Sequence, residues 1–114
     1  EKLKRNDVEI HVRSCFLQGI LANYDCKNKD YNQFKSWKKL LNNWIDWCNI
    51  NRVTRVKACM DFVRKFKKID YLIVGINDKE QLLSIIDIFQ QKIKYIPNSF
   101  LCNDKRLIEP NNWK

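Results

Sequence analysis

The sequence lacks the long apolar run that would mark a membrane protein. None of its 114 residues lies in an apolar stretch approaching the ~18 residues of a membrane span. The first seven residues also lack the apolar core of a secretory signal peptide. No internal repeat and no low-complexity stretch is visible. We therefore expect a cytoplasmic protein with no membrane partner and one domain at most.

The chain is also poor in the residues that build metal sites. It has a single histidine, His11, and five cysteines, none of which forms a CxxC pair. Zinc sites of the common kinds need four Cys or His ligands at close spacing. An odd number of cysteines favours reduced thiols. We therefore predict no metal site and no disulfide framework.

Positive charge is abundant, with a formal net charge of +9. Such an excess suggests nucleic acid, because lysine and arginine neutralise phosphates. The basic residues are spread along the chain, however, and the densest group, at 64–68, ends an amphipathic segment where the helix dipole favours cations. Trp37 and Tyr95 stand beside lysines and offer bases a stacking surface, yet Trp37 lies on a regular apolar stripe. The distribution disfavours nucleic acid, and a basic nucleic-acid-binding module stays an alternative.

The apolar periodicity predicts strands and helices in alternation. Residues 8–12 alternate apolar and polar types, and 71–75 form a short apolar run, so both segments are expected strands. Three- and four-residue apolar steps predict helices at about 34–48, 54–67 and 78–90. Thr54 is the expected N-cap of the second helix, and Asn77 or Asp78 that of the third. Residues 97–114 read as a loop-rich tail.

This order predicts an α/β fold. Two strands joined through helices return parallel with a right-handed crossover, so 8–12 and 71–74 are expected neighbours in one sheet. Parallel sheets are normally buried on both faces. Two parallel strands cannot cover themselves, which indicates part of a larger α/β domain.

Four segments together resemble the C-terminal part of the aldo-keto reductase family. VEIHVRSCFLQGIL at 8–21 is similar to the seventh barrel strand and its loop in bacterial members that have an RSxFLQG motif. ACMDFV at 58–63 with IDYLIVG at 69–75 is similar to the helix and eighth strand that follow. DKEQL at 78–82 resembles the next helix start, and DKRLIEPNNW at 104–113 the family's tail.

The resemblance implies the C-terminal portion of a (β/α)8 TIM barrel, about strands seven and eight with their helices. It also implies NAD(P)H-dependent reduction of a carbonyl to an alcohol. The family's catalytic Asp, Tyr, Lys and His belong to earlier strands and are absent, so this chain is expected to be inactive by itself. His11 does not match the catalytic histidine and is expected to be structural.

The family's cofactor-binding positions do map onto this chain. Arg13 stands where many members carry a Tyr that stacks on the nicotinamide. A guanidinium can also stack on the ring or pair with a charge. A salt bridge at the end of the strand is an equal alternative role for Arg13. Ser14, Phe16, Gln18 and Gly19 match the loop under the pyrophosphate, although Gly19 is also a plausible turn glycine. Gly75, Ile76 and Asn77 match the segment at the adenosine phosphate.

The sequence departs from the family at the 2′-phosphate. Gln81 and Ile85 replace the Arg and Asn that the family often has there. A neutral Gln cannot make the charge-assisted fork that selects a phosphate, which weakens the case for NADPH. Unpaired sheet edges and missing packing neighbours further predict association, either with the remaining barrel segments or with another copy of the chain. A non-enzymatic oligomerising module is therefore the second alternative.

Overall fold

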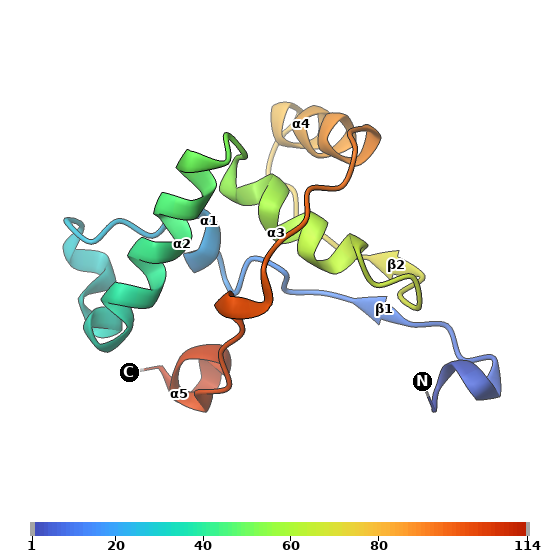
Figure 1. The fold of residues 1–114 in the computed structure, drawn as a ribbon, viewed down its shortest axis with the longest axis horizontal. Coiled ribbons are helices and arrows are strands. Elements are labelled where there is room, and N and C mark those ends of the chain that lie inside the picture. Colours follow the sequence, from blue (N-terminus) through green and yellow to red (C-terminus); the bar gives the residue numbers. More distant parts are fainter. Residues whose placement is uncertain (1, 114) are drawn as a thin grey trace. The chain divides into compact units, whose positions relative to one another are not determined.

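The structure is a computed structural model and describes residues 2–113 (Figure 1). Helices take up 54% of the chain. In chain order the elements are η1 Lys4–Asn6, β1 His11–Val12, α1 Ile20–Asn23, η2 Lys29–Trp37, α2 Lys38–Ile50, α3 Arg55–Arg64, β2 Tyr71–Leu72, α4 Lys79–Gln90, η3 Asn98–Phe100, α5 Lys105–Ile108 and η4 Pro110–Asn112, where η marks a 3-10 helix.

The expected partial (β/α)8 barrel is wrong. The described residues are mostly helical, and the strands they contain are β1 and β2, two residues each. The segments 8–12 and 71–75 have the composition of strands, but each finds one neighbour instead of two. A strand without a second partner gains few ladder hydrogen bonds, which limits its regular length.

The expected parallel pairing of these two segments is confirmed. His11 is in register with Tyr71, and Val12 with Leu72. The Tyr71 N–H donates to the Ile10 carbonyl oxygen at 3.2 Å, and the Ile73 N–H donates to the Val12 carbonyl oxygen at 2.8 Å. Residues 60 positions apart are therefore brought together at this two-stranded sheet.

The helices differ from expectation mainly at their ends. The helix expected at 34–48 is η2 followed by α2, because Phe34 has non-helical angles (φ −100°, ψ 15°) that kink the chain. α3 ends at Arg64, three residues before the expected end. The Lys57 N–H donates to Thr54 Oγ at 3.1 Å, so Thr54 caps α3. The tail expected to be loop-rich holds three short helical segments, η3, α5 and η4.

The chain divides into two compact units where one domain was expected. Residues 2–15 and 60–96 form the first, which we call the strand unit because it holds β1 and β2. Residues 16–59 and 97–113 form the second, which holds all four tryptophans and is called the tryptophan unit. The boundary falls inside α3, between Cys59 and Met60.

The tryptophan unit has a well-formed apolar core. Its buried members come from α1 and the residue after it, and from η2, α2 and α5; they are Ile20, Tyr24, Phe34, Leu41 and Leu107. The Trp113 ring meets the Phe34 ring edge-on with centroids 5.0 Å apart. The Trp44 Nε1–H donates to the Leu21 carbonyl oxygen at 2.9 Å. Residues distant in sequence thus close one core, and the Trp44 indole N–H finds an acceptor beside it.

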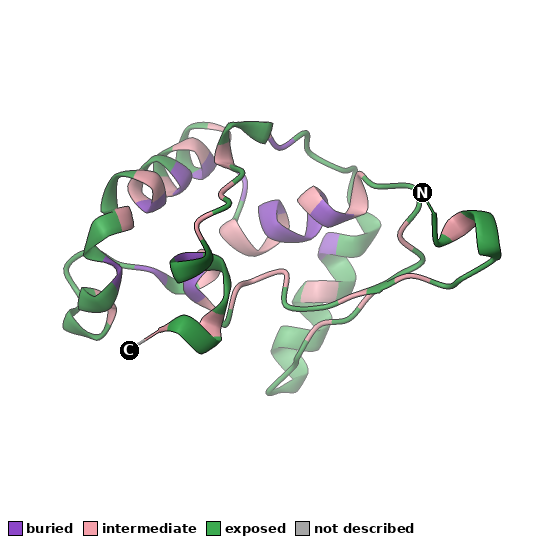
Figure 2. Ribbon diagram, turned by 90° about the horizontal axis from the view of Figure 1, so that it is seen from below, coloured by how far each residue is buried: buried purple, intermediate pink, exposed green. Residues whose placement is uncertain are grey.

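The strand unit leaves much of its apolar surface exposed. α4 is coloured almost wholly as exposed in Figure 2, and Ile88 is its one buried residue. The apolar face expected for this helix was Leu82, Ile85, Ile86 and Phe89. Leu82, Ile86 and Phe89 are 42%, 45% and 58% exposed, and Ile85 is half-buried. α4 carries apolar residues around most of its circumference, so periodicity alone does not single out a buried face. None of the described helices is long and apolar enough to cross a membrane.

Candidate cofactor-binding edge of the strand unit

The parallel pairing of β1 with β2 gathers two of the candidate segments. Both strands run in the same direction, so the residues that follow them leave from the same edge of the sheet. Arg13 and Ser14 follow β1, and Gly75, Ile76 and Asn77 follow β2 after two further residues. In open parallel sheets this carboxyl edge is where ligands bind.

The opposite, amino-terminal edge is held by one carboxylate. Asp70 Oδ2 accepts the Ile10 N–H at 2.7 Å and also pairs with the Lys4 ammonium. The hydrogen bond from Lys4, with that from Ile10, holds the pKa of Asp70 below its usual value. These bonds tie the start of β1 to the start of β2 and so fix the register that positions the carboxyl edge.

Arg13 is a free cation at the carboxyl edge. Its side chain is exposed, and it makes no hydrogen bond and no ion pair within residues 2–113. The salt bridge considered as an alternative for Arg13 is therefore not found in this part of the chain. An unpaired guanidinium keeps its full capacity for stacking or for pairing with a phosphate.

The backbone after β1 takes an uncommon conformation. Ser14, which follows β1, has φ of 62°, in the left-handed region that non-glycine residues seldom occupy. Such residues cluster at ligand sites, where the surrounding structure holds them in place. The loop is thus bent sharply directly after the edge.

Phe16, Gln18 and Gly19 belong to the tryptophan unit, so they lie outside the strand-unit part of the candidate edge. Gly19 has φ 86° and is the N-cap of α1, where its carbonyl oxygen accepts the Asn23 N–H at 2.9 Å. A methyl group added at Gly19 would lie 3.3 Å from Asn23 Nδ2. The turn itself therefore requires a glycine at this position.

Gly75 differs from Gly19 in that the chain does not need it. A methyl group added to Gly75 would meet no atom within 4 Å, and its φ lies outside the left-handed region. Gly75 and Ile76 are both exposed. This stretch of backbone is open to close approach by a ligand on the side where a Cβ would stand.

The start of α4 is occupied by the chain's own side chains. Asp78 is the N-cap, and its Oδ1 accepts the Gln81 N–H at 2.8 Å. Gln81 Oε1 in turn accepts the Asn77 N–H at 2.9 Å. The choice between Asn77 and Asp78 is thereby resolved for Asp78. Its carboxylate already satisfies the helix dipole, and it would repel a phosphate brought to the same place.

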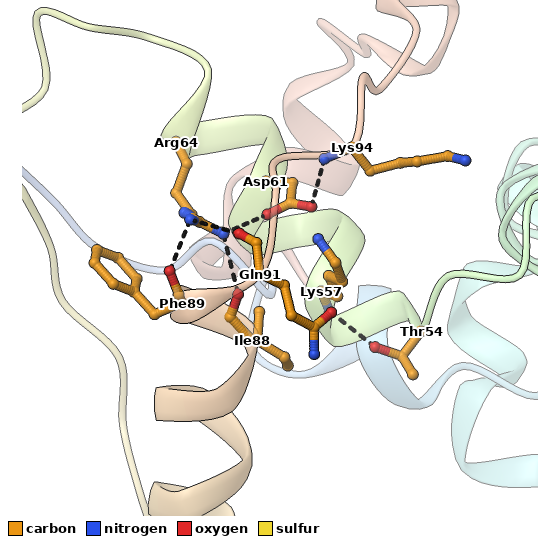
Figure 3. A network of polar contacts seen from close by, with 8 residues as sticks. All are labelled: Thr54, Lys57, Asp61, Arg64, Ile88, Phe89, Gln91 and Lys94. Carbon is orange, nitrogen blue, oxygen red and sulfur yellow. Dashed lines mark hydrogen bonds and ion pairs between the residues drawn. The ribbon is translucent and has the colours of Figure 1, made fainter.

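The most buried polar cluster in the strand unit was missed from the sequence (Figure 3). Asp61 is 0% exposed, and its carboxylate accepts from Arg64 Nη1 at 2.8 Å and from the Lys94 N–H at 2.8 Å. Arg64 also donates to three carbonyl oxygens at the end of α4, those of Ile88, Phe89 and Gln91. The sequence signal for this cluster is an acidic and a basic residue three positions apart, Asp61 and Arg64.

This cluster is a structural one. Among the described residues, every buried side-chain nitrogen or oxygen has a hydrogen-bond partner. Arg64 satisfies carbonyl groups that the end of a helix leaves unpaired, and its guanidinium lies 4.7 Å from the Phe89 ring centroid. Asp61 and Arg64 therefore join α3 to the end of α4.

Among the described residues, Cys15, Cys48 and His11 make no contact with one another. Burial raises the pKa of the Cys15 and Cys48 thiols to about 11, so both are protonated at neutral pH. His11 is exposed, contacts Glu9 and lies 4.7 Å from the Tyr71 ring centroid. In residues 2–113 no three Cys, His, Asp or Glu side chains are grouped as metal ligands.

Comparisons with known proteins give no match: none of the protein-family models fits the chain, and searches of curated proteins and of solved structures find no similar protein.

Proposed function

We propose that the carboxyl edge of the strand unit binds the phosphate-bearing part of a nicotinamide dinucleotide. The single observation that carries the proposal is the parallel pairing of β1 with β2, which brings Arg13 and Ser14 to the same edge as Gly75 and Ile76. These are positions at which the resemblance to aldo-keto reductases implies contact with NAD(P)H. The chain then contributes cofactor binding to a reductase of carbonyl groups.

The residues at this edge fit a pyrophosphate in two respects. Arg13 is exposed and unpaired in the described part of the chain, so it can pair with an anion without breaking an existing contact. The open side of Gly75 admits close approach to its backbone. Bound dinucleotide would supply the hydride, while Arg13 and the Gly75 backbone would hold and orient it.

The residues at the start of α4 do not fit a 2′-phosphate. Asp78 puts a carboxylate there, and the Gln81 side-chain oxygen is engaged by the Asn77 N–H. Neither side chain offers a cation to a dianionic group. We therefore propose that NADPH binds no more tightly than NADH.

Hydride chemistry is not assigned to this chain. The resemblance implies an Asp, a Tyr, a Lys and a His on segments that the chain does not contain, and without them no general acid stands beside a carbonyl oxygen. We expect no reduction of aldehydes or ketones by the purified chain with NADH or NADPH. Turnover that survives repurification and disappears on mutating Arg13 would contradict this expectation.

Calorimetric titration with NADH tests the binding proposal. Arg13→Gln is expected to weaken binding about tenfold, because it removes one charge-assisted hydrogen bond. Arg5→Gln is the matched control: Arg5 is an exposed arginine in η1, before β1, and its substitution makes the same charge change. It should leave the affinity unchanged. Equal losses of NADH affinity in the two variants would mean that only net charge matters, and would overturn the proposal. Wild-type protein that binds no NADH at millimolar concentration would overturn it as well.

A further inference from the structure

One face of the two-stranded sheet carries the polar side chains of β1. Glu9, His11 and Arg13 are exposed. Ile10 and Val12, which alternate with them, are half-buried. Because successive side chains of a strand point to opposite faces, the polar residues share one face and the apolar residues share the other. The sequence pattern itself therefore assigns the face of Glu9, His11 and Arg13 to solvent.

Two aromatic rings contact each other on this solvent face. His11 of β1 is in register with Tyr71 of β2, and their ring centroids lie 4.7 Å apart with the ring planes tilted by 41°. Tyr71 is 54% exposed, and both residues belong to the strand unit. Aromatic side chains on the open face of a sheet are a common stacking surface for nucleobases.

The charges on the solvent face give a bound nucleotide a direction. Arg13 lies two residues from His11 toward the carboxyl edge, and Glu9 lies two residues from it the other way. A phosphate is therefore attracted to the Arg13 end of the face and repelled from the Glu9 end. Tyr71 is opposite His11, so it is about 7 Å from the level of Arg13 at ~3.3 Å per residue. The ribose between a base and its phosphate spans a distance of this order.

We infer that Tyr71 is the stacking surface for the adenine of the dinucleotide bound at the carboxyl edge. The inference rests on the proposed function, because the phosphates held by Arg13 bring the base to the sheet. Adenine fits this surface better than the reduced nicotinamide, since it is the larger ring system and the dihydronicotinamide of NADH is not aromatic. The contact with His11 restrains the Tyr71 ring, which reduces the entropy lost when the base binds.

Calorimetric titration with ADP and with nicotinamide mononucleotide tests the inference. ADP carries adenine and two phosphates, whereas nicotinamide mononucleotide carries a phosphate and no purine. Tyr71→Leu keeps a large apolar side chain but removes the ring, so it should weaken ADP binding about tenfold. Tyr71→Phe keeps the ring and should bind ADP as the wild type does. Neither variant should change the affinity for nicotinamide mononucleotide. Tyr95→Leu is the control, since Tyr95 is 70% exposed in the same unit but follows α4; it should leave ADP binding unchanged.

A measurement on the unmodified chain does not depend on the folding of any variant. The ring proton signals of Tyr71 should shift upfield when ADP is added and should not move with inorganic pyrophosphate, because only a stacked base places a ring current over the tyrosine. Equal shifts with the two ligands would overturn the inference.

The outcomes separate this inference from the proposed function. Tyr71→Leu that binds ADP as tightly as the wild type, or equal losses in Tyr71→Leu and Tyr71→Phe, would overturn the role of Tyr71. The proposed function would survive either result if Arg13→Gln still weakened NADH binding. A wild-type chain that binds neither NADH nor ADP at millimolar concentration would overturn both.

Discussion

Replacing Asp61 with alanine removes the centre of the buried polar cluster that joins α3 to α4. The carboxylate is fully buried and accepts from the Arg64 guanidinium and the Lys94 N–H, each at 2.8 Å. Breaking a buried ion pair by removing one partner costs about 3–5 kcal/mol. Arg64 keeps its three bonds to the carbonyl oxygens of Ile88, Phe89 and Gln91, so we expect a loss of about 3 kcal/mol.

Urea unfolding measures this loss, and the tryptophans help to locate it. All four lie in the tryptophan unit, whereas Asp61 lies in the strand unit. Far-UV circular dichroism records the helices of both units. For Asp61→Ala the dichroism midpoint should fall by about 1–3 M urea, since the slope for small proteins is about 1–3 kcal/mol/M. The tryptophan fluorescence midpoint shows whether the second unit unfolds with the first.

Asp46→Ala supplies the matched control. Asp46 is exposed on α2, so the same substitution within a helix makes the same change of charge and of helix propensity without touching a buried group. It should alter the free energy of unfolding by less than about 0.5 kcal/mol. If Asp61→Ala loses less than about 1 kcal/mol, the cluster does not hold α3 to α4, and this interpretation of Figure 3 is wrong.

Two further predictions use other positions of the chain. Gly19→Ala should lower the free energy of unfolding by about 1–2 kcal/mol, because alanine is strained at φ 86°. Gly75→Ala should change it by less than about 0.5 kcal/mol. Equal losses of stability in thermal unfolding would contradict the assignment of Gly19 as a turn glycine. The pKa of Asp70 is lowered by Lys4, so its contribution to stability is complete above the unfolded-state pKa near 3.8 and is lost as pH falls through the folded-state value. Asp70→Asn should therefore lower stability at pH 6 and converge with wild type in strong acid, and a constant difference across pH would refute the linkage.

Local sequence signals predicted the strand pairing but not the fold around it. The alternation at 8–12, the apolar run at 71–75 and the helices between them were enough to predict that β1 and β2 pair in parallel. The inference of a partial barrel went further than these signals, because it assumed that both strands would be long and would have second neighbours. In the described residues each strand has one neighbour and a length of two.

The apolar periodicity of α4 does not show which face of the helix is buried. Around α4 the apolar residues Ile88, Ile85, Phe89, Leu82 and Ile86 follow one another at steps of about 20–60°, so the pattern does not single out a buried face. Arg64 of α3 donates to the carbonyl oxygens of Ile88 and Phe89 and so joins α3 to the end of α4. That contact depends on an acid–base spacing that occurs as often on solvated surfaces.

The candidate site was predicted in part. The resemblance named Arg13, Ser14, Gly75 and Ile76, and the strand pairing brings them to one edge. It also named Gln81, whose side chain is engaged at the start of α4. A capping bond of this kind depends on the backbone geometry around Asp78. Asn and Asp are both common N-cap residues, so the residue types alone do not decide whether Asn77 or Asp78 caps the helix.

The most direct test of the central claim follows the backbone amides by NMR while NADH is added. Gly19 and Gly75 are the only two glycines in the chain, so their signals are readily found and serve as separate reporters. If the carboxyl edge binds the dinucleotide, the amides of Ser14, Gly75 and Ile76 should shift together and saturate, and Arg13→Gln should reduce the shifts at equal NADH. Shifts confined to residues distant from this edge, or no shift at millimolar NADH, would contradict the account.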